Sequence, residues 1–120
     1  MTNSIDFLKE LSEEFCLEYV QLSRDSAFLY YPNFYDICLV TNFGAGENKI
    51  SINSLNKVII NDDYSAELMK GGYEVYNILA SKAIRQRLAI TVNKAKDVIE
   101  SIKKKKINDK IKDLNKDFEN

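Results

Sequence analysis

The chain is 120 residues long, with 45% apolar residues, 29% charged residues and a formal net charge of −1. This size and composition are typical of a single globular domain and exclude a disordered or disulfide-stapled protein. The sequence contains no histidine and only two cysteines. Because His-based acid–base catalysis, Ser–His and Cys–His nucleophiles and His-ligated metals are all excluded, we expect no enzyme and no catalytic, cofactor-binding or metal-binding residues.

No apolar run approaches the roughly 18 residues that a membrane span needs. The first residues also lack the pattern of a signal peptide. We therefore expect a cytoplasmic protein with no membrane partner.

The two cysteines, Cys16 and Cys38, both fall in apolar patterns and are expected to be buried and unpaired.

The charge is distributed unevenly along the chain. Residues 1–81 contain 12 acidic and 5 basic side chains, a balance of −7, whereas residues 82–120 contain 12 basic and 6 acidic side chains, a balance of +6. Such an asymmetry indicates an electrostatic partner for one of the halves. That partner is either the other half of the protein or a separate molecule, and the sequence leaves both alternatives open.

The first predicted element is an amphipathic helix over about residues 4–22. Apolar residues recur at helical spacing from Ile5 to Leu22, with glutamates on the other faces. Asn3 or Ser4 precedes them as a capping residue.

After this helix the pattern changes to that of β-strands. The aromatic and β-branched runs 27–31 and 34–41 are separated by Pro32-Asn33, a dipeptide that favours a tight turn. The second run is apolar on both faces, so it is predicted to be a central strand. Further strands are predicted over residues 49–53 and 57–61, which makes an antiparallel sheet of three or four strands.

A short helix is predicted over residues 64–70, ended by Gly71-Gly72. From Tyr73 to Asn120 the chain contains no glycine and no proline. Since nothing in this stretch resists helical backbone angles, it is predicted to be a long C-terminal helix that is apolar on all sides over residues 73–80.

The apolar pattern of the long helix changes side near its end. A stripe made by Ile107, Ile111, Leu114 and Phe118 lies about 120–140° around an unbroken helix from the stripe that precedes it. Four lysines, Lys103 to Lys106, stand at the change, where like charges disfavour a helix. We therefore expect a break or a re-phasing near residues 103–109.

The predicted fold class is α+β, with an N-terminal helix, an antiparallel sheet, a short helix and a long C-terminal helix. Residues 1–106 are predicted to form a single domain and residues 107–120 a helical extension. The loop Gly44-Ala-Gly46 has two glycines but precedes a strand and lacks the third glycine of a dinucleotide-binding loop, so we expect no cofactor.

Two sequence features predict a protein-binding surface. The terminal stripe has no evident place in the core, and six of the 13 aromatic residues lie between residues 28 and 43. Aromatic residues in such a cluster form either the core of a sheet or the anchor of a partner. The predicted partner-binding residues are Ile107, Ile111, Leu114 and Phe118, together with Tyr30 and Tyr31.

The basic residues of the long helix favour a different partner. Residues 82–106 contain nine lysines and arginines against two acids, and the most direct use of such a surface is to neutralise phosphates. The predicted nucleic-acid contacts are Lys82, Arg85, Lys96, Lys103, Lys104, Lys105 and Lys106. The alternative is a solvated helix face, or one that docks on the acidic part of the chain.

The sequence resembles no family closely enough to name one. The leading hypothesis is a non-catalytic cytosolic interaction protein, a homo-oligomer that binds and masks a protein partner as a chaperone or an inhibitor does. The high content of Asn, Ile and Lys, 39 of 120 residues, favours an AT-rich genome such as that of a phage or mobile element. The alternative hypothesis is a nucleic-acid-binding accessory protein.

Overall fold

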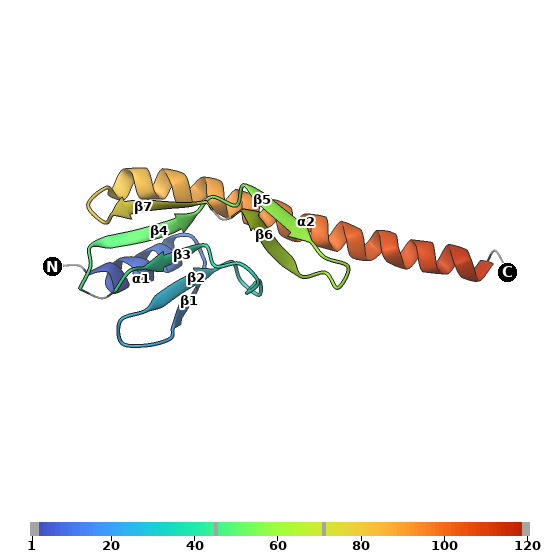
Figure 1. Ribbon diagram of the computed structural model, residues 1–120, viewed down its shortest axis with the longest axis horizontal. Helices are drawn as coiled ribbons and strands as arrows, with labels where there is room; N and C mark the ends of the chain where they lie inside the picture. The colour runs from blue at the N-terminus through green and yellow to red at the C-terminus, as the bar shows by residue number, and fades with distance from the viewer. Residues whose placement is uncertain (1–2, 45, 71, 119–120) are drawn as a thin grey trace.

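The computed structural model describes residues 3–44, 46–70 and 72–118, except for the side chains of Lys70, Asp117 and Phe118. In these parts of the chain, seven strands lie between an N-terminal and a C-terminal helix. Five strands form an antiparallel sheet in the order β1-β2-β3-β4-β7, and β5 and β6 form a separate hairpin (Figure 1). The α+β class is confirmed, but the prediction of three or four strands was too low.

Helix α1 (Ser4–Glu14) ends well before the predicted end at residue 22. Asn3 caps its start through a side-chain hydrogen bond of 2.8 Å to a backbone amide of the first turn. The chain then turns at Cys16, which has a positive φ of 56°. The following residues leave the helix and form β1 (Glu18–Gln21), an edge strand that pairs with β2 (Ala27–Tyr30).

The other strands of the large sheet are β3 (Val40–Asn42), β4 (Lys49–Asn53) and β7 (Tyr73–Asn77). β3 is central, as predicted, but it contains only the end of the predicted run 34–41. β7 overturns the prediction that the long helix begins at residue 73. Its aromatic and β-branched residues fit a strand, and all five of its residues pair with β4.

The hairpin consists of β5 (Lys57–Ile60) and β6 (Ala66–Lys70). The predicted short helix 64–70 was therefore wrong. Its residues are good helix formers, but helix propensity is a weak local preference that strand pairing overrides. The turn between the two strands includes Tyr64, which has a φ of 68° and donates its backbone amide to the Asn61 carbonyl.

Helix α2 (Ser81–Phe118) is a single helix of 38 residues, so the predicted break near residues 103–109 was wrong. The lysine run does not interrupt it, because Lys105 pairs with Asp109 one turn later at 3.3 Å. The apolar pattern nevertheless changes side along the continuous helix. Ile84 and Leu88 are fully buried, whereas Ile107, Ile111 and Leu114 of the terminal stripe are exposed. None of the described helices is long and apolar enough to cross a membrane.

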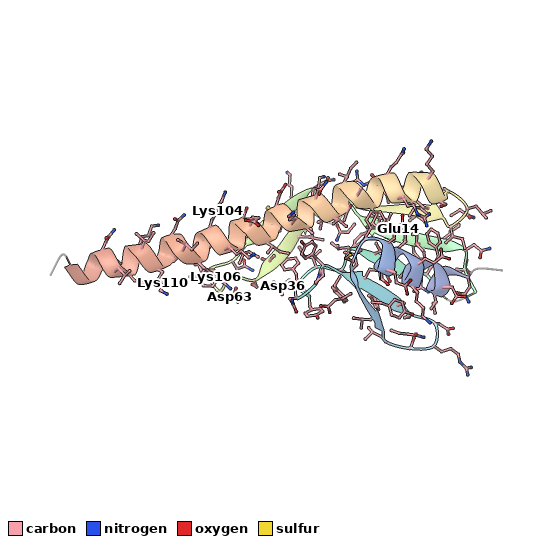
Figure 2. All side chains as sticks on the ribbon, turned by 180° about the vertical axis from the view of Figure 1, so that it is seen from behind. Glu14, Asp36, Asp63, Lys104, Lys106 and Lys110 are labelled. Atoms are coloured by element: carbon pink, nitrogen blue, oxygen red, sulfur yellow. The ribbon has the colours of Figure 1, made fainter. Side chains whose placement is uncertain are left out.

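Both helices cover the same face of the five-stranded sheet, as the opposite views in Figures 1 and 2 show. α1 contacts β1, β2 and β3, and α2 contacts β4. Arg85 of α2 and Glu14 of α1 form an ion pair at 2.9 Å, which joins the two helices side by side. The core between the layers includes Leu8, Leu11, Leu29, Val40, Ile50, Ile52, Ile84 and Leu88.

Beyond the body, the last turns of α2 extend past the hairpin (Figure 1). We call residues 103–118 the arm. It gives the molecule a length of 68 Å, compared with 25 and 24 Å along the other two axes.

Candidate partner-binding surfaces

We call the face of the large sheet that lies opposite the helices the open face. No described helix packs on it, although Ser51 and Asn53 of β4, which the register places on this face, are buried. Successive side chains of a strand point to opposite sides, and the register places Phe28, Thr41, Ser51 and Val75 in one row across the sheet. The adjacent row of Leu29, Val40 and Ile52 is buried under the helices. By the same register the open face carries five apolar or aromatic residues and six polar ones: Val20, Phe28, Tyr30, Tyr73 and Val75, and Glu18, Thr41, Lys49, Ser51, Asn53 and Asn77.

Aromatic rings gather at the β2 side of the open face. The ring centroids of Phe28 and Tyr30 lie 6.5 Å apart, and those of Tyr30 and Tyr35 lie 5.6 Å apart in an edge-to-face arrangement. The Tyr35 hydroxyl donates to the Glu18 carboxylate, a bond that raises the pKa of Tyr35. Burial raises the pKa of Tyr30. Both phenols are therefore neutral at physiological pH, and Tyr30, a predicted partner-binding residue, lies on this surface.

The open face continues onto Phe43, at the end of β3. Phe43, Glu47, Lys49 and Val75 line a shallow depression of about 370 Å³. Phe43 is 57% exposed and Val75 is 54% exposed. Exposed apolar side chains thus lie at two places on this side of the sheet, at Tyr35 and at Phe43 with Val75, and Thr41 and Ser51 lie in the row between them.

A groove of about 700 Å³ lies beside the open face, between the 31–36 loop, the tip of the hairpin and α2. It is lined by aromatic and basic side chains from distant parts of the chain, among them Tyr31, Tyr64, Lys96, Lys103 and Lys106. Tyr31 was predicted to bind the same partner as Tyr30. The structure instead separates the two residues, since one lies on the open face and the other lines the groove.

Asp36 fixes the loop that forms one wall of this groove. Its carboxylate accepts a hydrogen bond of 2.9 Å from the backbone amide of Ala66, at the start of β6. The 31–36 loop is thereby attached to the hairpin. Figure 2 shows Asp36 at this junction.

The arm presents an unpartnered apolar stripe. Ile107 is 59% exposed, Ile111 is 50% exposed and Leu114 is 52% exposed. The side chain of Phe118, the fourth predicted member, lies outside the described part of the chain. The stripe faces solvent because the core contacts of α2 lie on another side of the helix.

The other side of the arm is held by the hairpin. The Tyr64 hydroxyl donates to the Asp109 carboxylate at 3.0 Å, and this bond, with that from Lys105, lowers the pKa of Asp109. Lys105 also forms an ion pair with Asp62 at 3.7 Å. The hairpin therefore fixes the direction in which α2 leaves the body.

The basic residues of α2 do not form one continuous surface. Arg85 pairs with Glu14, and Arg87 approaches Glu74 at 3.4 Å, so part of the basic half docks on the acidic half. Of the predicted nucleic-acid contacts, the structure brings Lys96, Lys103 and Lys106 to the groove. Lys82 and Arg85 lie at the start of α2, Lys105 is paired with carboxylates, and Lys104 is exposed on the arm.

The open face as a whole could not be found from the sequence, because β7 had been predicted as helix. The sequence signal that was missed is the two-residue period of a strand. In this pattern Tyr73 and Val75 share one face, and Glu74 and Tyr76 share the other. In the chain as far as it is described, no three Cys, Asp or Glu side chains come together in a way that could hold a metal ion.

Comparisons of the chain with protein-family models, with curated proteins and with solved structures found no match in any of the three. A functional proposal therefore depends on the surfaces described above. Two of these surfaces, the open face and the arm, expose several apolar side chains.

Proposed function

We propose that this chain is a non-catalytic, self-associating protein that binds and masks a protein partner through the open face. The observation that carries the proposal is the set of exposed apolar side chains on and beside this sheet face, Tyr35, Phe43, Tyr73 and Val75. When an antiparallel sheet has one face in solvent, that face normally carries polar side chains. Here it also carries the half-buried Phe28 and Tyr30 and the exposed Tyr73 and Val75, and exposed apolar side chains of this kind are typical of interaction sites.

The surroundings of the open face define the chemistry of the partner. Glu18 lies beside Tyr35, and Glu47 lies with Lys49 beside Phe43, so acidic side chains outnumber basic ones around these apolar residues. A complementary partner is a protein segment whose apolar side chains are flanked by lysine or arginine. Binding would keep that segment out of water, which is the action of a chaperone or an inhibitor.

A matched pair of variants tests the proposal. Val75 on the open face is 54% exposed, and Ile90 on α2 is 47% exposed. Val75→Lys places a charge in the proposed interface, whereas Ile90→Lys places the same charge outside it. The immobilised chain and both variants would be used to capture proteins from a native host extract, and each captured protein would then be purified and titrated calorimetrically.

We expect Val75→Lys to weaken binding of the true partner at least about tenfold, or about 1.4 kcal/mol, and Ile90→Lys to leave it unchanged. Circular dichroism would establish that both variants keep the fold. If Val75→Lys and the wild type bind every captured protein equally, the open face is not the binding surface.

Nucleic-acid binding in the groove is the second candidate function. It is favoured by Lys96, Lys103 and Lys106, which surround Tyr31 and Tyr64 in an arrangement that suits phosphates and stacked bases. It ranks second because Asp36 and Glu100 line the same groove and because other basic residues of α2 are paired within the chain.

Fluorescence anisotropy with a single-stranded oligonucleotide tests this second function. Binding should weaken steeply as salt rises, and replacing Lys103 to Lys106 by glutamine should remove most of it. An affinity that the four substitutions leave unchanged would rule out nucleic-acid binding in the groove.

A further inference from the structure

We propose that the arm of a second copy of this chain occupies the open face, so that two chains form a reciprocal dimer. Each arm lies on the sheet of the other chain. The inference rests on the proposed function, because it takes the open face as a protein-docking surface and names one occupant for it.

The first argument is that each molecule exposes two apolar surfaces of complementary shape. The arm is a helix with a narrow stripe formed by Ile107, Ile111 and Leu114, each of them at least half exposed. The open face is a sheet surface with Phe28 and Tyr30 on β2 and with Tyr73 and Val75 on the edge strand β7. Packing an amphipathic helix on a sheet is one of the standard ways to bury both surfaces.

The second argument is that the arm cannot reach the open face of its own chain. The first half of α2 packs on the opposite face of the sheet, where Thr91 donates to the Asn53 carbonyl at 2.8 Å. α2 then continues without a break to Phe118 and extends away from the body (Figure 1). An arm that covers an open face must therefore come from another molecule.

The third argument concerns charge and length. The arm contains seven lysines and three aspartates, a balance of +4 over residues 103–118, whereas Glu18 on the open face and Glu47 at its edge outnumber Lys49. At about 1.5 Å per residue the arm is about 24 Å long. Four inter-strand spacings of about 4.8 Å make a five-stranded sheet about 19 Å wide. The arm is therefore long enough to span the open face.

The fourth argument is the area that a stable dimer needs. A specific interface buries roughly 1,200–2,000 Å² in total. A coiled coil between two arms would contain only about two heptads, fewer than the three or four that are typical of such a structure. A reciprocal dimer buries two arms and two sheet faces, and its twofold symmetry closes the assembly at two chains.

This arrangement also relates self-association to partner binding. The arm has the features expected of the partner segment, namely a narrow apolar stripe flanked by lysines. The second copy therefore competes with the partner for the open face. Partner binding would displace the arm and convert the dimer into monomeric complexes.

Light scattering of the full chain, from low micromolar to several hundred micromolar, tests the dimer. Ile111→Lys disrupts the arm, Val75→Lys disrupts the open face, and Ile90→Lys is the matched control. The wild type and Ile90→Lys should be dimers, and each of the other two variants alone should show about half that mass. In an equimolar mixture of Ile111→Lys and Val75→Lys, native mass spectrometry should detect a heterodimer. The intact arm of the Val75→Lys chain can dock on the intact open face of the Ile111→Lys chain.

Each alternative arrangement gives a different result. A wild-type chain that is monomeric at every concentration overturns the inference. A Val75→Lys variant that remains dimeric indicates an arm-to-arm contact, and an Ile111→Lys variant that remains dimeric indicates a face-to-face contact. A mixture that contains only monomers excludes the pairing of arm with face. If a lysine substitution unfolds the chain, serine at the same position tests the same prediction.

Different experimental outcomes contradict the reciprocal dimer and the proposed partner binding. Ile111→Lys removes the arm contact but leaves the open face intact, so this variant should still capture the partner. A monomeric wild type whose partner binding is weakened by Val75→Lys would leave the proposed function standing without the dimer. A reciprocal dimer that captures no partner would leave the dimer standing without the proposed function.

Discussion

The two cysteines have different surroundings. The Cys38 thiol lies 3.2 Å from the Val40 carbonyl oxygen, and burial raises its pKa to about 11. Cys16 is exposed, at the residue with positive φ where the chain leaves α1. Both cysteines were predicted to be buried. Cys16 is exposed, because the helix in which it was placed ends before it, and Cys38 is only partly buried.

This difference predicts unequal thiol reactivity. Only the thiolate reacts with a disulfide reagent, and with a pKa of about 11 only about one Cys38 in a thousand is ionised at pH 8. A raised pKa lowers the thiolate fraction at every pH below it, so native protein should show one fast thiol and one slow thiol. Cys16→Ser should remove the fast phase, and unfolding in urea should make Cys38 fast as well. Two fast thiols in the native wild type would contradict the burial of Cys38.

At the scale of elements, a buried hydrogen bond attaches α2 to the sheet. Thr91 is fully buried, and its hydroxyl donates to the backbone carbonyl of Asn53 at the end of β4. This bond satisfies a strand-end carbonyl that has no access to water. It also fixes the position of the helix along the strand.

Thr91→Val should therefore lower the free energy of unfolding by about 1–3 kcal/mol, because it leaves the Asn53 carbonyl buried without a donor. Thr91→Ser keeps the hydroxyl and loses only a methyl group, which costs about 0.8 kcal/mol. Urea unfolding curves measure both changes. A valine variant as stable as the serine variant would show that the hydrogen bond does not contribute.

The elements that the sequence predicted are those with a local cause. Asn3 caps α1, the Pro32-Asn33 turn follows β2, and residues 49–53 alternate as a strand does. The failures at residues 64–70 and 73–77 have a non-local cause. Both segments contain residues that suit a helix or a strand, and pairing with β5 and β4 decides between the two.

The candidate binding surfaces also differ in whether local sequence or the completed fold determines them. The stripe of Ile107, Ile111 and Leu114 follows from counting residues around one helix, so the sequence was sufficient to predict it. The open face depends on the order of five strands and on the side that the helices cover, which no local pattern specifies. The pairing of Arg85 with Glu14, 71 residues apart, likewise depends on the completed fold.

At the scale of the whole molecule, the arm makes the chain elongated. The Cα radius of gyration is 17.4 Å, whereas a compact chain of this length has about 13.6 Å. Small-angle scattering of the monomeric Ile111→Lys variant should therefore give a value well above that of a compact domain. A value near 14 Å would mean that the arm folds back on its own body, and it would remove the reason for docking on a second copy.

The uninterrupted course of α2 also constrains which changes in length the protein can accept. Every added residue turns the helix by about 100° and advances it by about 1.5 Å. One alanine inserted after Lys110 would carry Ile111 and Leu114 to another side of the arm with the composition almost unchanged. Seven inserted residues would return the stripe to within about 20° of its original side of the helix, but would move it about 10 Å along the helix axis. The register between the sheet and the tip is thus specified by a residue count, so over the arm we expect substitutions to be tolerated far more readily than insertions or deletions.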